Sequence, residues 1–154
     1  MRLTIVAVGK LKEPFWRAAA EEYAKRLRPY ATIEIAEVPD RDIARDAAAA
    51  RSAEADDILR ALPPAAYAVV LDERGRERSS QELAAWLDEL AVGGTSHVAF
   101  VVGGSSGLDD RLRDGARETV SLSRMTLPHQ LARVVLLEQL YRAFRISRGE
   151  PYHL

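Results

Sequence analysis

The sequence predicts a single α/β domain built on a mainly parallel β-sheet flanked by helices. Short apolar runs alternate along the chain with longer segments whose apolar residues recur at helical spacing. A chain of 154 residues suits one domain with one sizeable core, and no linker or internal repeat divides it. We therefore expect one domain over residues 1–154.

Five strands are predicted from apolar or alternating runs. They span residues 3–8, 32–38, 67–71, 97–102 and 119–123. The second run alternates apolar and polar residues, so we expect that strand to be more exposed than the first. The third run is followed by Asp72-Glu73-Arg74-Gly75, which predicts a polar turn.

The predicted helices are recognised by apolar spacing and by their start and stop residues. They span residues 15–27, 42–62, 80 to the Gly93-Gly94 pair, 109–116 and 129–147. Pro14 and Pro29 bracket the first helix, and Pro63-Pro64 ends the second. In the last helix the predicted core residues are Val134, Leu137, Leu140, Tyr141 and Phe144. Three arginines, Arg133, Arg142 and Arg145, recur on its other faces.

Composition limits the class of protein. Hydrophobic residues make up 47% and charged residues 29%, as in a soluble globular protein. The absence of cysteine excludes disulfides and cysteine-based metal or nucleophile sites. The N-terminal apolar run is too short for a signal peptide, and no run approaches the ~20 residues that cross a bilayer. We expect a cytoplasmic protein with no membrane partner.

The charges are nearly balanced. Twenty-two basic and 23 acidic residues give a net charge of −1, so no global positive field would drive nonspecific RNA binding. An RNA substrate would have to be recognised through a local patch, a dimer surface or an elaborate folded target.

Three loops are predicted to share one pocket, because ligands of open parallel sheets bind outside the carboxyl ends of the strands. The loops follow Leu71, begin at Gly103 and span residues 123–129. Gly103-Gly104 would let the backbone approach a flat ligand, although a tight turn into the next helix explains the pair more simply. The stretch GGSSGL has neither dinucleotide-binding nor Walker spacing.

Three further features could carry chemistry. His129 follows Pro128 at a helix start, where a histidine is more often structural than catalytic. Arg142 lies four residues after Glu138, so a surface ion pair is its simplest role. Tyr152 and His153 either fray with the chain end or dock against a partner or a pocket, where they would suit a nucleobase.

At these residues the sequence resembles a known family. The stretches LDERG, GGSSGL, SLSRMTLPHQLARVVLLEQLYRAFRI and PYH, with the opening MRLTIVAVGK, are similar to the bacterial ribosomal RNA large subunit methyltransferase H family. The resemblance covers essentially the whole chain. It implies a SPOUT-type α/β fold with a C-terminal trefoil knot. It also implies S-adenosylmethionine as cofactor and methylation of N3 of a pseudouridine in 23S rRNA within the ribosome.

The resemblance also implies the site residues. The cofactor would be held by Leu71, Gly103, Gly104, Leu122, Ser123, Arg124, Met125, Thr126, Leu127 and Pro128. The active site would contain His129, Arg142, Tyr152 and His153, with the pocket completed across a homodimer. We expect no metal and no DNA partner. The sequence departs from the family pattern in the middle of GGSSG, in the Ala- and Asp-rich residues 39–50 and at the terminal Leu154.

The implied reaction needs proton removal from N3 before methyl transfer. A neutral imidazole could take that proton and an arginine could stabilise the anion. We expect Arg142 in the second role, Tyr152 as a stacking or orienting group, and His129 or His153 near the proton.

Two other functions agree with parts of the pattern. A catalytically silent, ribosome-associated RNA-binding module would keep the fold and the dimer without binding the cofactor. A receiver-like signalling domain could use Asp72 as phosphoacceptor, but it needs an acidic pair where Gly9-Lys10 stand.

Overall fold

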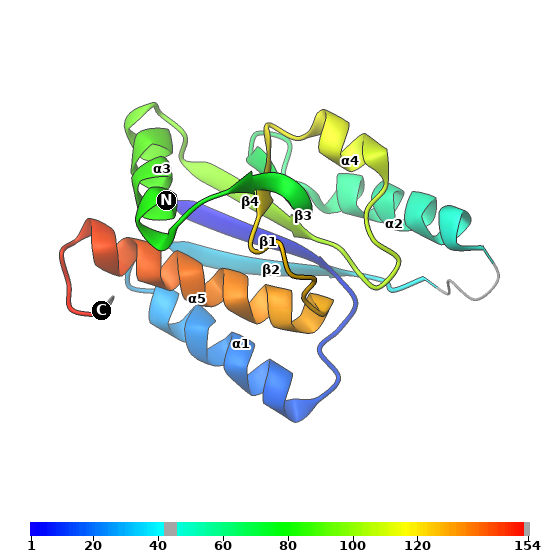
Figure 1. The fold of residues 1–154 in the computed structure, drawn as a ribbon, viewed down its shortest axis with the longest axis horizontal. Coiled ribbons are helices and arrows are strands. Elements are labelled where there is room, and N and C mark those ends of the chain that lie inside the picture. The colour runs from blue at the N-terminus through cyan, green and yellow to red at the C-terminus, as the bar shows by residue number, and fades with distance from the viewer. Residues whose placement is uncertain (42–45, 153–154) are drawn as a thin grey trace.

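The computed structural model describes residues 1–41 and 46–152 and is centred on a five-stranded sheet (Figure 1). The strands are β1 (Arg2–Val8), β2 (Thr32–Val38), β3 (Tyr67–Glu77), β4 (His97–Val102) and β5 (Glu118–Ser121). Their order is β2-β1-β4-β3-β5, and every pair is parallel. The predicted α/β class with a parallel sheet is confirmed.

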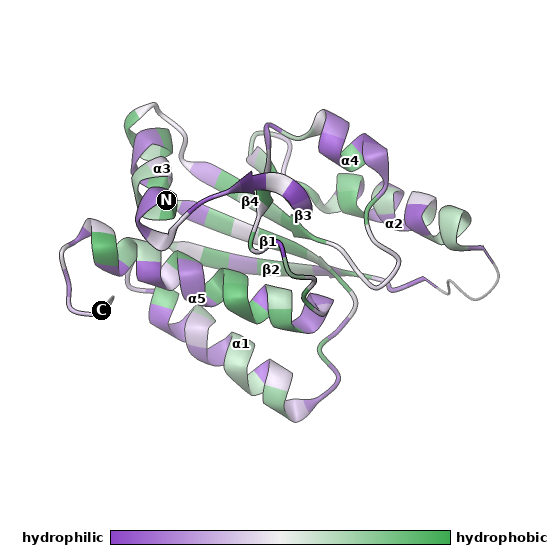
Figure 2. Ribbon diagram, viewed as in Figure 1, coloured by the Kyte–Doolittle hydropathy of each residue, from purple (hydrophilic) through white to green (hydrophobic). Residues whose placement is uncertain are grey.

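Five helices within the described residues cover the two faces of this sheet. They are α1 (Pro14–Leu27), α2 (Ala47–Ala61), α3 (Ser80–Val92), α4 (Asp110–Gly115) and α5 (His129–Ser147). Alternate residues of β1 divide the core: Leu3 and Ile5 pack with α1, α3 and α5, whereas Val6 and Val8 pack with α2 and α4. Figure 2 shows hydrophobic residues, in green, and hydrophilic residues, in purple, alternating around the helices. No described helix is long and apolar enough to cross a membrane.

The strand order excludes the receiver-like signalling domain. Receiver domains have the order 2-1-3-4-5, whereas β4 lies between β1 and β3 here, so the receiver-like interpretation is wrong. The expectation for β2 is confirmed, because it is an edge strand in which only Val38 is buried.

The predicted end of the third strand is wrong. β3 continues through the expected polar turn to Glu77, and its second half pairs with β5 after a register shift between Leu71 and Arg76. A Cβ at Gly75 would lie 2.7 Å from the backbone of β5, so only glycine allows this pairing. Residues 72–75 were predicted as a turn because their polar run lacks the alternation of apolar and polar residues that is typical of a strand.

Helix ends follow local signals. Ser79 and Glu82 form a reciprocal capping box at the start of α3. Asp109 and Asp46 accept backbone hydrogen bonds at the starts of α4 and α2. Helix α2 begins at Ala47, and residues 42–45 of its predicted range lie outside the described part. α4 and β5 are shorter than predicted, at residues 110–115 and 118–121.

The long helix α5 has the predicted bounds but not the predicted polar face. Leu137 and Leu140 are fully buried as expected. Arg133, placed by its spacing outside the core, is only 3% exposed. Its guanidinium donates to Glu37 Oε2 at 2.7 Å and to the Gly9 carbonyl at 2.8 Å. This pair fastens α5 to the ends of β1 and β2.

Candidate functional site

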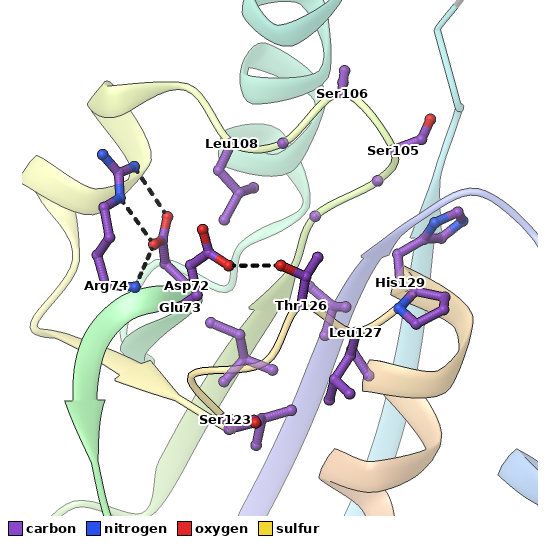
Figure 3. Close-up of a pocket in the computed structure, with 18 of the residues that line it drawn as sticks. Asp72, Glu73, Arg74, Ser105, Ser106, Leu108, Ser123, Thr126, Leu127 and His129 are labelled. Atoms are coloured by element: carbon purple, nitrogen blue, oxygen red, sulfur yellow. Dashed lines mark hydrogen bonds and ion pairs between the residues drawn. The ribbon is translucent and has the colours of Figure 1, made fainter.

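A cavity of about 940 Å³ opens at the carboxyl ends of the strands (Figure 3). Its volume lies within the range typical of ligand pockets. All three predicted loops line it, so the expectation of one shared pocket is confirmed. The predicted residues in its wall are Leu71, Gly103, Gly104, Leu122, Ser123, Met125, Thr126, Leu127, Pro128 and His129.

The glycine loop brings backbone to the cavity wall. Gly104 and Gly107 face each other in a short bridge, with the Gly107 N–H donating to the Gly104 carbonyl at 3.2 Å. Gly107 has φ +80°, a region that suits glycine. Ser106 donates at 2.7 Å to Glu54, a carboxylate only 2% exposed on α2. The side chain of Ser106 therefore fixes the loop against a buried group on α2.

Side chains are excluded at the two leading glycines. A Cβ at Gly103 would lie 2.9 Å from Leu108, and one at Gly104 would lie 2.8 Å from Val8. Both contacts are shorter than ordinary carbon–carbon contacts of about 3.5–4.0 Å. The pair is thus required by packing, since neither glycine has a positive φ.

The third loop is ordered by its own hydroxyl groups. Ser121 donates to the Ser123 carbonyl at 2.9 Å, and Ser123 Oγ accepts from the Met125 N–H at 2.9 Å. Pro128 then adopts φ −55° and ψ 142° and places His129 as the first residue of α5. The half-buried His129 lies in the cavity wall.

Arg124 differs from its neighbours in this loop. Its side chain is 87% exposed and lies 3.8 Å from Glu77. The structure does not bring this residue into the cavity wall.

A charged wall was missed by the sequence analysis. Asp72 accepts hydrogen bonds from Arg74 and, at 2.9 Å, from Arg113. Burial of Asp72 favours its neutral form, but the two arginines outweigh burial and hold the pKa of Asp72 below its usual value. Glu73 accepts from Thr126 Oγ1 at 3.1 Å and so links the first loop to the third (Figure 3). The loop after Leu71 was predicted to lie in the pocket and LDERG was used for the family resemblance, but the charged residues of this stretch were given no role in the wall.

The other predicted active-site residues lie elsewhere in the chain. Arg142 donates to Glu138 Oε1 at 2.9 Å, and Tyr152 donates to the same oxygen at 3.1 Å. The Arg142 guanidinium also lies 4.6 Å from the centre of the Tyr152 ring. Burial, reinforced by Glu138, raises the pKa of Tyr152 to about 12. The predicted ion pair of Arg142 is confirmed, and the tail as far as Tyr152 is docked on α5.

One chain therefore separates the predicted active-site residues into two groups. His129 and Arg142 are 13 positions apart on one helix, which corresponds to about 20 Å along its axis. No single side chain spans that distance. His153 lies outside the described residues.

Comparison with known proteins supplies the family. Residues 1–153 match the family described as predicted SPOUT methyltransferase. The chain is 49% identical to ribosomal RNA large subunit methyltransferase H of Symbiobacterium thermophilum and 47% identical to that of Acetivibrio thermocellus, each over 99% of both chains. The corresponding protein of Bacillus pumilus is 46% identical.

A solved structure agrees at the level of the fold. The probable methylase family protein from Haemophilus influenzae Rd KW20 is 15% identical and superposes with a TM-score of 0.53, over 99% of this chain and 70% of that one. The parallel sheet, the cavity built from three loops and the near full-length identities lead to one assignment. The chain belongs to the SPOUT methyltransferase family, among the ribosomal RNA large subunit methyltransferase H proteins.

Proposed function

We propose that this protein is an S-adenosylmethionine-dependent methyltransferase that methylates N3 of a pseudouridine in 23S rRNA of the large ribosomal subunit, in the cytoplasm. The observation that carries the proposal is the cavity at the carboxyl ends of the strands, whose wall contains ten of the residues that the family resemblance implies. The names of the relatives, which specify ribosomal RNA of the large subunit, support the substrate class.

The cavity suits the cofactor. Gly103 and Gly104 leave backbone where side chains would clash, which favours a flat adenine. The cofactor also carries positive groups, and the Glu73 carboxylate supplies negative charge in the wall. Residues 71, 103–104, 122–123 and 125–128 would hold it. When bound, it supplies a methyl group already activated by a sulfonium, so the protein has mainly to position the acceptor.

The side chains of this protein would prepare the acceptor. His129 lies in the cavity wall, where a neutral imidazole could take the N3 proton. Arg142 would stabilise the resulting anion, and Tyr152 would orient the base by stacking. His153 remains the alternative proton acceptor.

These roles require a homodimer, because about 20 Å of helix separates His129 from Arg142 in one chain. Two antiparallel copies of α5 would bring Arg142 of one chain to His129 of the other, with the two-fold axis close to Val135. Leu131 and Val135 suit such a contact, since both are half-buried and lie outside the two core clusters of the described residues. The trefoil knot that the resemblance implies stays a prediction.

Complementation tests the composite site. Gly103→Arg should abolish cofactor binding, and Arg142→Ala should abolish transfer while leaving cofactor binding intact. Mixed after dissociation and reassociation, the two inactive variants should recover about a quarter of wild-type activity, because half of the dimers are mixed and each has one intact site. No recovery, with mixed dimers demonstrated by mass spectrometry, would refute the shared site.

Calorimetry distinguishes the enzyme from a silent ribosome-associated module. The wild type should bind S-adenosylmethionine saturably, and Gly103→Arg should not. If the folded wild type binds neither S-adenosylmethionine nor its demethylated product, alone or with large ribosomal subunits, the silent module is the better explanation.

A further inference from the structure

A second cavity lies between α1 and the edge strand β2. It has a volume of about 400 Å³. One wall is a single face of α1, because its residues recur every three or four positions. The floor comes from alternate residues of β2, which share one face of the strand. The lining residues are Arg17, Ala20, Glu21 and Ala24 on α1, Arg28 at its C-cap, and Ile33, Ile35 and Glu37 on β2.

The rim of this groove is basic, although the whole chain carries a net charge of −1. Four cations and two carboxylates line it. Arg133 and Glu37 neutralise each other at 2.7 Å. This leaves Lys10, Arg17 and Arg28, whose side chains have no hydrogen bond or ion pair within the described part of the chain, against Glu21 alone.

The groove is elongated. Arg17 and Arg28 are 11 positions apart on the same helical face, or about 16 Å along the axis. Its floor is apolar, with Ile35 40% exposed. Cations spaced along a groove with an apolar floor match single-stranded nucleic acid, whose phosphates are charged and whose unstacked bases have apolar faces.

The groove adjoins the first cavity. Arg133 lines the groove, whereas His129, one helical turn earlier on α5, lines the first cavity. That turn corresponds to about 6 Å along the axis. Gly9, which accepts a hydrogen bond from Arg133, directly precedes Lys10 at the groove's end. An RNA that presents a base to the first cavity would therefore run close to the groove.

We propose that the groove between α1 and β2 binds a single-stranded segment of the RNA substrate next to the target nucleotide. Phosphates lie at Lys10, Arg17 and Arg28, and a base lies on the floor at Ile35. This inference rests on the proposed function, since the segment belongs to the RNA that is methylated.

Charge reversal tests the contacts with a fluorescent ten-nucleotide uridine RNA as the probe. Arg17→Glu and Arg28→Glu should each weaken its binding by about tenfold near 0.1 M salt and reduce the salt dependence by about one phosphate contact. Lys25→Glu is the matched control, because it makes the same charge change at an exposed residue of α1 outside the groove. Ala24→Phe fills the groove without a charge change and should also weaken binding.

Methylation of large ribosomal subunits provides a second readout. The groove variants should raise KM for subunits by a similar factor, with kcat and cofactor affinity as in Lys25→Glu. Circular dichroism checks that each variant is folded. Binding and KM equal to the control would overturn the inference. An altered KM with unchanged RNA binding would also overturn it, because the groove would then contact a ribosomal protein.

The two proposals fail differently. A wild type that transfers no methyl group, but whose RNA binding still depends on Arg17 and Arg28, would refute the proposed function and leave a single-strand RNA groove. Normal methyl transfer with unaltered groove variants would refute the groove alone.

Discussion

Gly103→Ala should weaken cofactor binding slightly more than it weakens the fold. The new Cβ would lie 2.9 Å from both Cγ and Cδ2 of Leu108, about 0.6–1.1 Å closer than ordinary carbon contacts. Gly103 does not have a positive φ, so the backbone accepts alanine and the whole effect is steric. Leu108 is half-buried in the cavity wall, so it can relieve the contact by moving into the cavity.

The movement of Leu108 determines how much unfolding free energy and how much cofactor affinity are lost. Overpacking in a tight core costs about 1–3 kcal/mol, and a side chain at a cavity edge should cost at the lower end, about 1 kcal/mol. The displaced Leu108 side chain then takes up space in the cavity. We expect this to cost about 1.4 kcal/mol of cofactor-binding free energy, which raises Kd tenfold. Calorimetry with S-adenosylmethionine and urea unfolding measure the two quantities on the same preparation.

Gly104→Ala provides the comparison, because the neighbouring glycine packs against the core instead of the cavity wall. Its Cβ would lie 2.8 Å from Cγ1 of Val8, which is 1% exposed and cannot move into a cavity. Here we expect the larger loss of unfolding free energy, about 2–3 kcal/mol. Gly115→Ala, with nothing within 4 Å, is the control. Unchanged cofactor affinity in Gly103→Ala, or equal stability losses in both variants, would refute the reasoning.

Three further predictions concern the frame of the site and the dimer. Arg133→Met should lower the unfolding free energy, measured by urea unfolding, by about 2 kcal/mol, because it removes charged hydrogen bonds. Glu37→Gln should lower the unfolding free energy by less, since Glu37 is one-third exposed. Asp72 has a lowered folded pKa, so its stabilisation is present above the unfolded pKa and is lost as pH falls through the folded value. Asp72→Asn should therefore be less stable than wild type near pH 7, and urea titrations should show the difference disappearing as pH falls through the folded pKa of Asp72. Val135→Arg should yield monomers in sedimentation and no methyl transfer; an active dimer would contradict the proposed interface.

Local signals were sufficient for most elements of the fold. The buried run at residues 97–102 predicts β4 with the observed bounds, and residues 129–147 predict α5. The extension of β3 to Glu77 could not be predicted, because the polar residues form a strand only through pairing with β5 across a register shift. The burial of Arg133 also escaped prediction, since its partner Glu37 is 96 positions away.

The site was predictable to a similar degree. Parallel topology places three loops at one edge of the sheet, so the cavity followed from the order of the elements. The charged wall did not, because the salt bridge from Asp72 to Arg113 joins residues 41 positions apart. The resemblance supplied Arg142 and Tyr152, but only the structure shows that Arg142 lies about 20 Å along α5 from His129 in one chain, with the Tyr152 ring against Arg142.

Transfer of a labelled methyl group from S-adenosylmethionine to large ribosomal subunits that lack the modification tests the central claim most directly. Nucleoside digestion and mass spectrometry then locate the label. The account predicts N3-methylpseudouridine from 23S rRNA, formed by the wild type and absent with Arg142→Ala. Saturable cofactor binding without label in 23S rRNA, or label on a different base, would contradict it.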